Sequence, residues 1–183
     1  MRFPLLHQLE LPCVFEQLVP GELHPDGQRY LPLILLRPTR ATDLLPAGLV
    51  LGVVDRHHCA DKQAVGRSGV ARLVFALSAL RVQKPPFRQG LVPEPDWRGG
   101  VSTAPGALGR IVTVGAWELT RGPLPYETLY TELTLDIGLG VIGTRTNLTA
   151  TSLAALFGQE HLAPGCAIEL TRSRIDLLEF VVT

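Results

Sequence analysis

Apolar and polar residues alternate along the chain in short runs, and Pro and Gly interrupt these runs at close intervals. Such a pattern predicts strands rather than long helices. The expected strands span residues 13–19, 29–36, 47–54, 71–82, 109–120, 128–138 and 140–147. The last region, residues 166–182, is expected to hold either one bent strand or two. The fold class is therefore mainly β, with antiparallel strands in one or more small barrels.

One short helix is expected near residues 150–157, within the segment "NLTATSLAALFG". Asn147, Thr149 and Thr151 are alternative N-caps, and a run of good helix formers follows them. Gly158 is suited to end the helix, because glycine readily adopts the left-handed conformation at a helix C-terminus.

Residues 85–105 contain five prolines and three glycines without any periodicity. This composition predicts a long loop or a linker between two halves. The expected organisation is an N-terminal β region over residues 1–84, with a second small barrel as one alternative, the linker, and a barrel over residues 106–183.

The segment "LVLGVVDRHHCADKQAVGR" can be aligned with "IGLGVIGTRTNLTATSLAA", which pairs Gly52 with Gly140. Two related halves would explain this similarity. Chance matching of Gly, Val and Leu is the alternative, and the sequence leaves both open.

Gly138, Gly140 and Gly143 have the spacing of a dinucleotide-binding fingerprint. The preceding run alternates between apolar and polar residues, whereas the central strand of a dinucleotide fold is apolar on both faces. The residues after Gly143 are rich in Thr, so a helix would begin too late to face a phosphate. We therefore expect these glycines to bend strands where a barrel closes.

From residue 106 onward, the expected order is three strands, a short helix and one or two terminal strands. This order resembles the OB-fold, a five-stranded Greek-key barrel, over fewer than half of the residues. The resemblance implies an OB-like C-terminal half and a strand face that binds oligonucleotides or oligosaccharides.

Charge is unevenly distributed, although 17 Lys and Arg residues balance 17 Asp and Glu residues. Residues 56–88 contain seven basic residues and one acid, Asp61, a local charge of +6. Residues 101–183 contain five Arg residues and eight acids, a net charge of −3. Since a neutral molecule has no long-range attraction for nucleic acid, any such binding depends on this local charge.

A basic strip beside loop aromatic residues suits single-stranded nucleic acid, because cations track phosphates and aromatic rings stack on bases. We therefore expect a non-enzymatic binding module with no cofactor and no catalytic residues. The expected contact residues are Arg56, Lys62, Arg67, Arg72, Arg81, Lys84, Phe87, Arg88 and Trp97. Ordinary solvated arginines would give the same pattern. Another alternative is a protein-interaction or assembly subunit that docks through apolar strands and the Pro-rich segment, and homo-oligomerisation stays open.

Residues 55–61 gather side chains of the types that bind zinc and other transition metals. They are Asp55, His57, His58, Cys59 and Asp61. Adjacent residues of a strand point to opposite faces, and the sequence supplies no second cluster such as Cys-x-x-Cys. We expect a polar turn without metal, and a small metal-dependent enzyme is the third alternative.

The three cysteines, Cys13, Cys59 and Cys166, are odd in number and widely spaced, which predicts reduced thiols. The longest aliphatic run, "LPLILL" at residues 31–36, is far shorter than the roughly 20 residues of a membrane span. The N-terminus does not have the pattern of a secretory signal. These features predict a cytoplasmic protein that does not enter membranes.

Overall fold

The computed structural model describes residues 7–40, 42, 44–119, 128–146 and 148–183, and the chain is mainly β. The longer elements are β1 (Leu9–Val19), β2 (Leu33–Pro38), β3 (Val50–Val54), β4 (Ser68–Val82), β7 (Gly106–Leu119), β8 (Thr128–Asp136), β9 (Val141–Thr146), α1 (Ala150–Leu156) and β10 (Ala167–Val182). Every strand expected from the alternation forms, with ends that differ by a few residues, which confirms the fold class.

Three short elements lie where the sequence shows no alternation. They are the 3-10 helix η1 (Lys62–Ala64) and the strands β5 (Gly90–Val92) and β6 (Val101–Ser102). Strand β5 pairs with β7 and β6 pairs with β3, so the Pro-rich segment is attached to the sheet at two places.

The strands of the described ranges share one sheet, ordered β6-β3-β2-β1-β4-β10-β7-β8-β9 with β5 beside β7. Strand β3 also pairs in parallel with β10 at Val54 and Asp176. This pairing closes β1, β2, β3, β10 and β4 into a five-stranded barrel of mixed strand orientation. The closed barrel is compatible with an OB-like barrel. The sequence predicted such a barrel in residues 106–183, whereas the closed barrel consists of β1 to β4 and β10, because over the described residues β9 does not pair with β4 to close the C-terminal part.

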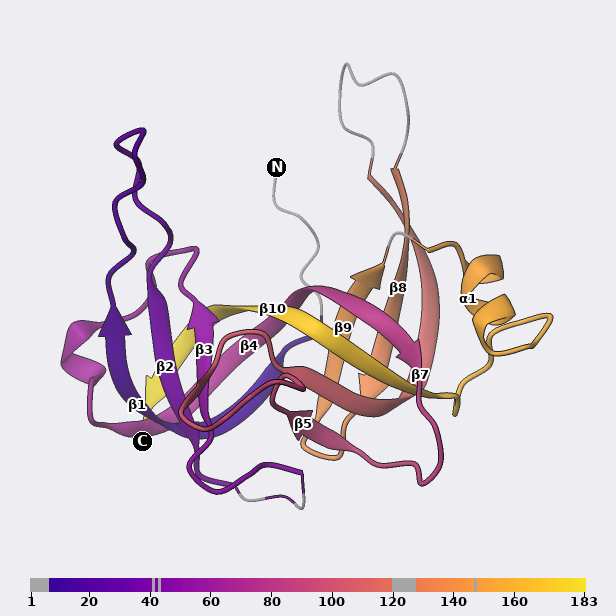
Figure 1. Cartoon of the computed structure of the whole chain (residues 1–183), viewed down its shortest axis with the longest axis horizontal. Helices are drawn as coiled ribbons and strands as arrows, with labels where there is room; N and C mark the ends of the chain where they lie inside the picture. Colours follow the sequence, from indigo (N-terminus) through magenta and orange to yellow (C-terminus); the bar gives the residue numbers. More distant parts are fainter. Residues whose placement is uncertain (1–6, 41, 43, 120–127, 147) are drawn as a thin grey trace.

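Two long strands, β4 and β10, run through both parts of the molecule (Figure 1). Strands β7, β8 and β9 continue the sheet from β10 and curl until β9 lies against β4. Of the two alternatives for the terminal region, the single bent strand forms, with register shifts along its pairing to β4. Each curled part is therefore completed by a long strand from the other half of the sequence.

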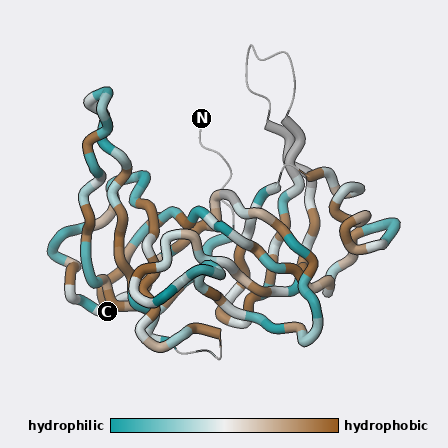
Figure 2. Tube along the Cα trace, viewed as in Figure 1, coloured by the Kyte–Doolittle hydropathy of each residue, from teal (hydrophilic) through white to brown (hydrophobic). Residues whose placement is uncertain are grey.

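The alternation along β1 directs one set of side chains into the barrel. Leu9, Leu11, Cys13 and Phe15 are buried, while the residues between them are exposed or half-buried. The Phe15 ring packs edge-on against Phe180 of β10, with ring centroids 5.4 Å apart. Figure 2 shows apolar and polar positions alternating along the strands. Burial of these apolar side chains is the main term that stabilises the barrel.

The two halves repeat the same order of elements, which supports the internal repeat. Strands β1, β2 and β3, helix η1 and strand β4 correspond to β7, β8, β9, α1 and β10. Phe15 and Ile111 hold equivalent positions, because each exchanges two backbone hydrogen bonds with residues that precede a long strand. These bonds run from Phe15 N–H to Arg67 O (3.0 Å), Gly66 N–H to Phe15 O (2.7 Å), Ile111 N–H to Cys166 O (2.9 Å) and Gly165 N–H to Ile111 O (2.7 Å).

The strand registers give the alignment of the repeat. Leu36 pairs with Leu51 in one half, and Leu135 pairs with Ile142 in the other. The next residues, Gly52 and Gly143, are therefore equivalent, and both are buried. The sequence alignment that paired Gly52 with Gly140 is wrong by three positions, because it matched Leu-Gly-Val at 51–53, within β3, to Leu-Gly-Val at 139–141, which begins in the turn before β9.

Two glycines of the fingerprint, Gly138 and Gly140, lie in the hairpin between the antiparallel strands β8 and β9, and Gly143 lies within β9. Ile137 N–H donates to Gly140 O at 3.1 Å, and Gly138 has a φ of +74° that favours glycine. Helix α1 begins at Ala150, capped by the Thr149 side chain, and not at Gly143. The structure confirms the prediction of a strand turn here and contradicts a phosphate-binding turn.

Candidate nucleic-acid interface

Five residues gather where β4 ends, and we refer to them as the β4-end cluster. They are Arg81, Lys84, Phe87, Arg88 and Arg110. The first four belong to the predicted contact residues. The fifth, Arg110, comes from β7 and was missed, because only the tertiary structure brings β7 beside the segment that follows β4.

Gln83 holds this segment in place from a buried position. Its side-chain amide nitrogen donates to Ile168 O at 3.3 Å, and its side-chain oxygen accepts from the backbone N–H of Arg88. Both polar atoms of the amide are thus used within the protein. The segment from Lys84 to Arg88 is fixed against β10, so its side chains are presented in a defined arrangement.

Phe87 and Arg110 form a stacked pair on the surface. The guanidinium carbon of Arg110 lies 5.5 Å from the centroid of the Phe87 ring, in a cation–π arrangement. Arg110 Nη1 also donates to Gly165 O at 3.0 Å, which fixes the plane of the guanidinium. The Phe87 side chain is 50% exposed. A flat cationic and aromatic surface is therefore open to solvent.

A groove of about 530 Å³ lies beside this pair. Arg81, Lys84 and Arg88 line it, together with one acid, Glu169, which pairs with Arg81 in the β4–β10 register. In the described part of the chain, these three cations take part in no ion pair. All three are exposed, so their charge is available to an anionic ligand.

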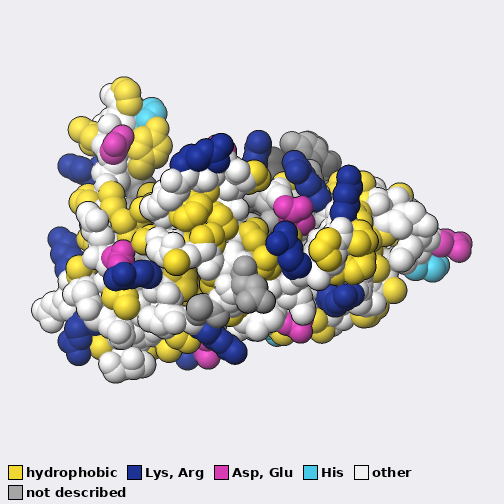
Figure 3. Space-filling view, turned by 60° about the horizontal axis from the view of Figure 1, so that its bottom comes forward, with side chains coloured by type: hydrophobic (Ala, Val, Ile, Leu, Met, Phe, Trp, Pro, Cys, Tyr) yellow, Lys and Arg dark blue, Asp and Glu magenta, His cyan; other side chains and the backbone are white. Residues whose placement is uncertain are grey.

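The other four predicted cations, Arg56, Lys62, Arg67 and Arg72, lie toward the opposite end of β4. Strand β4 has 15 residues, and a strand rises about 3.3 Å per residue, so roughly 45 Å separates its ends. Figure 3 shows Lys and Arg side chains spread over one face with apolar patches between them. The seven basic residues therefore form two groups and not one continuous strip.

Arg56 and Arg72 are engaged with acidic side chains. Arg72 lies 3.4 Å from Glu10 and 2.8 Å from Glu179, measured between nitrogen and carboxylate oxygen. Arg56 Nε lies 4.0 Å from Asp176. These contacts lower the net charge that this end of β4 presents to a ligand.

Trp97 is half-buried and packs against the hydrophobic core. Its indole N–H donates to Gly100 O at 3.3 Å. The ring contributes to packing of the Pro-rich segment, and the structure does not bring it into the β4-end cluster.

The candidate metal ligands lie in the turn after β3, where Asp55 organises the backbone. Asp55 is buried, and its carboxylate accepts from Cys59 N–H (2.9 Å), Ala60 N–H (3.1 Å) and Cys59 Sγ (3.3 Å). His57, His58 and Asp61 are exposed. Asp61 caps η1 by accepting from Gln63 N–H. Over the described residues, no three His, Cys, Asp or Glu side chains are grouped to hold a metal ion.

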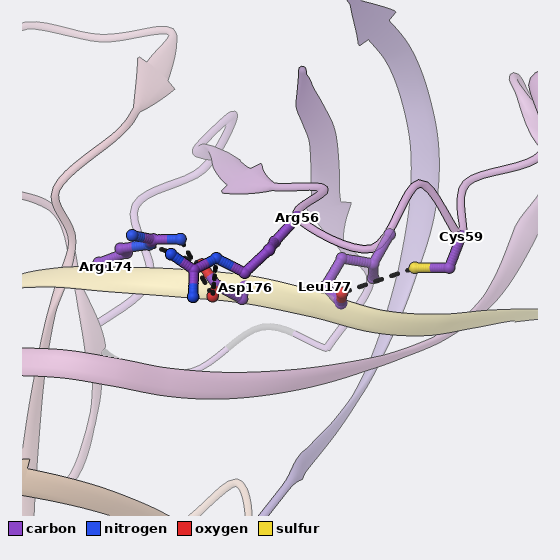
Figure 4. Close-up of polar contacts among 5 residues, drawn as sticks. All are labelled: Arg56, Cys59, Arg174, Asp176 and Leu177. Carbon is purple, nitrogen blue, oxygen red and sulfur yellow. Dashed lines mark hydrogen bonds and ion pairs between the residues drawn. The ribbon is translucent and has the colours of Figure 1, made fainter. Parts of the chain in front are cut away.

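Cys59 is held as a neutral thiol. Cys59 is an exposed residue, but partial desolvation of its sulfur, followed by the hydrogen bond and negative charge of Asp55, raises its pKa to about 12. Figure 4 shows the Cys59 sulfur directed at Leu177 O on β10, 3.5 Å away. Metal ligation and nucleophilic attack both need the thiolate, so this environment favours neither.

Figure 4 also shows Asp176 between two arginines on the same side of β10. The Asp176 carboxylate is buried and accepts from Arg174 Nε (2.8 Å) and Nη2 (3.3 Å). Together with Arg56, these contacts tie the turn after β3 to β10 at the place where the barrel closes. The residues around 55–61 thus serve barrel closure in this structure.

Comparisons with protein-family models, curated protein sequences and solved structures return no match to this chain. None of the helices in the described ranges is long and apolar enough to cross a membrane.

Proposed function

We propose that this protein binds single-stranded nucleic acid through the β4-end cluster. The observation that carries the proposal is a groove of about 530 Å³ lined by three cations, beside an exposed aromatic ring on which a fourth cation, Arg110, stacks. Cations in a groove follow the phosphate backbone, and flat aromatic or guanidinium groups stack on bases. The chain also contains a barrel compatible with the OB-fold, a fold that binds oligonucleotides, and we infer a relationship to that superfamily. The β4-end cluster lies outside this barrel, at the other end of β4, so the proposal depends on the cluster itself.

The balance of basic and acidic residues sets the affinity that we expect for nucleic acid. Three free cations and one acid line the groove, and the whole chain has a formal net charge of zero. Few phosphates are therefore neutralised, and long-range attraction is weak. We expect micromolar or weaker affinity at low salt, which falls further as salt rises.

The test is fluorescence anisotropy with a labelled 20-nucleotide single strand over a series of salt concentrations. Changing Arg81 and Arg88 to Ala should lower the affinity and also flatten the salt dependence, by about 0.7 in the log–log slope for each phosphate that the variant no longer neutralises. The matched control changes Lys62 and Arg67 to Ala, which removes the same charge at the other end of β4. Equal effects of the two double variants, or no binding at low salt, would contradict the proposal.

A second candidate function, docking on a protein partner, is favoured by the connection between β1 and β2. This hairpin projects from the barrel (Figure 1) and exposes the apolar side chains of Leu23 (62%) and Tyr30 (59%). Backbone hydrogen bonds between His24 and Gln28 and between Glu22 and Tyr30 order it. Sedimentation velocity tests a second copy as the partner. Self-association that persists at high salt and is lost in Leu23→Ser would favour this function.

A further inference from the structure

A second cavity, of about 470 Å³, lies on the other side of the segment that holds the β4-end cluster. Val82 and Gln83 line both this cavity and the groove, so the two adjoin. The cavity volume is within the range of small-molecule pockets, and the cavity is widely open to solvent, which suits one base of a longer strand. Two aromatic residues from distant parts of the sequence, Phe87 and Phe157, contribute to its wall.

The chemistry of the wall suits a flat heteroaromatic ring. Aliphatic and aromatic side chains supply most of the lining, and Arg110 is its one charged residue. The Arg110 guanidinium is fixed by Phe87 on one side and by Gly165 O. Its other face can stack on a planar ring. Gln159 adds an exposed side-chain amide. Its oxygen accepts from Cys166 Sγ at 3.6 Å, and its nitrogen can donate to the polar edge of a ring.

The groove next to the cavity has the complementary chemistry. Its three cations are free to bind phosphate, and it shares the lining residues Val82 and Gln83 with the cavity. The side-chain amide of Gln83 is fully used within the protein, so it serves as a dividing wall. A nucleotide has these two parts, a planar base and an anionic phosphate, joined by a short sugar.

We propose that the cavity takes one unstacked base of a single strand, while the adjoining phosphates lie in the groove. This inference rests on the proposed function and adds to it a subsite for the base. Stacking on a ring or guanidinium tolerates any base, so the site reads the presence of a base and not a particular sequence.

The experiment compares two labelled 20-mers by fluorescence anisotropy at one low salt concentration. One is oligo(dT), and the other has the same phosphate backbone with an abasic sugar at every position. Oligo(dT) should bind about ten-fold more tightly to the wild-type protein, because base stacking contributes only to its binding. Phe87→Ala should remove this difference by weakening oligo(dT) alone. Tyr30→Ala, a similar loss of an exposed aromatic ring far from the cavity, should leave both affinities unchanged.

The outcomes separate the two proposals. If both polymers bind equally and Phe87→Ala changes neither, the base subsite is wrong and backbone binding stands. If neither polymer binds, the proposed function fails.

Free thymidine monophosphate is added as a competitor. Displacement of oligo(dT) by the monophosphate at equal concentration would overturn the assignment to a polymer. Arg88→Ala should weaken both polymers by the same factor, and an effect on oligo(dT) alone would contradict the placement of phosphate in the groove.

Discussion

The crossing of β4, β9 and β10 contains a buried hydroxyl network that allows a quantitative test of how the two curled parts are joined. Ser78 Oγ on β4 lies 2.8 Å from Ser173 Oγ on β10, and Thr144 Oγ1 on β9 donates to Ser78 Oγ at 3.4 Å. All three residues are buried, with at most 7% of each exposed. Ser78 is thus the shared partner of two hydroxyls on two other strands.

Changing Ser78 to Ala should destabilise the protein more than changing Ser173 to Ala. Without Ser78, both remaining hydroxyls lose a partner inside the protein, whereas without Ser173, Ser78 still has Thr144. A buried hydroxyl left without a partner costs roughly 1–3 kcal/mol. We expect Ser78→Ala to lower the free energy of unfolding by about 3 kcal/mol and Ser173→Ala by about 1 kcal/mol.

The double variant should lose less free energy of unfolding than the two single variants lose together. Each single change leaves an unpartnered polar group, which the second change removes. A coupling of at least about 0.5 kcal/mol is typical of residues in contact. Urea unfolding, followed by tryptophan fluorescence, gives the four free energies of the cycle. Additive effects, or a larger loss for Ser173→Ala than for Ser78→Ala, would refute the network as the polar connection between these strands.

Three further outcomes follow from close packing and from the thiols. A Cβ at Gly69 would lie 2.3 Å from a backbone oxygen of β10. Gly69→Ala should therefore lower the thermal midpoint by about 5 °C or more, whereas Gly115→Ala, with 3.9 Å to its nearest atom, should not. Burial raises the pKa of Cys13 to about 11 from an ordinary 9.0. This neutral thiol therefore stabilises the fold fully below pH 9, and the contribution is lost as pH rises through 11. Unfolding in urea from pH 8 to 11 should show a shallower pH dependence for Cys13→Ala, and equal slopes would contradict this. Asp55→Asn removes a charge that raises the pKa of Cys59, so iodoacetamide should modify Cys59 faster at pH 9, as measured by peptide mass spectrometry. An unchanged rate would show that Asp55 does not control this thiol.

The local pattern predicted most of the secondary structure. Alternation along β1 and β8 marks their buried faces, and the glycines at 138 and 140 mark a tight turn. The Thr149 cap and the Gly158 stop bound the one α-helix of the described ranges. These features depend on side-chain period and backbone conformation within a few residues, so they are visible in the sequence alone.

The grouping of the candidate site was only partly visible in the sequence. The seven basic residues between 56 and 88 follow one another along the chain, but β4 is extended and holds them in two groups. Arg110 was missed because no residue near it in sequence indicates that it stacks on Phe87. Partners in a sheet are set by long-range pairing, which has no local signature.

The strands, the helix and the turn between β8 and β9 can be predicted locally, because they follow from hydrophobic period and from glycine and capping residues. The choice of the strands that close the barrel depends on contacts between distant parts of the chain. The parallel pairing of β3 with β10 joins Val54 to Asp176, residues more than half the chain apart. Closing the barrel buries the apolar side chains that β1, β2 and β3 direct inward, and the 16 residues of β10 are enough to pair in both parts of the molecule.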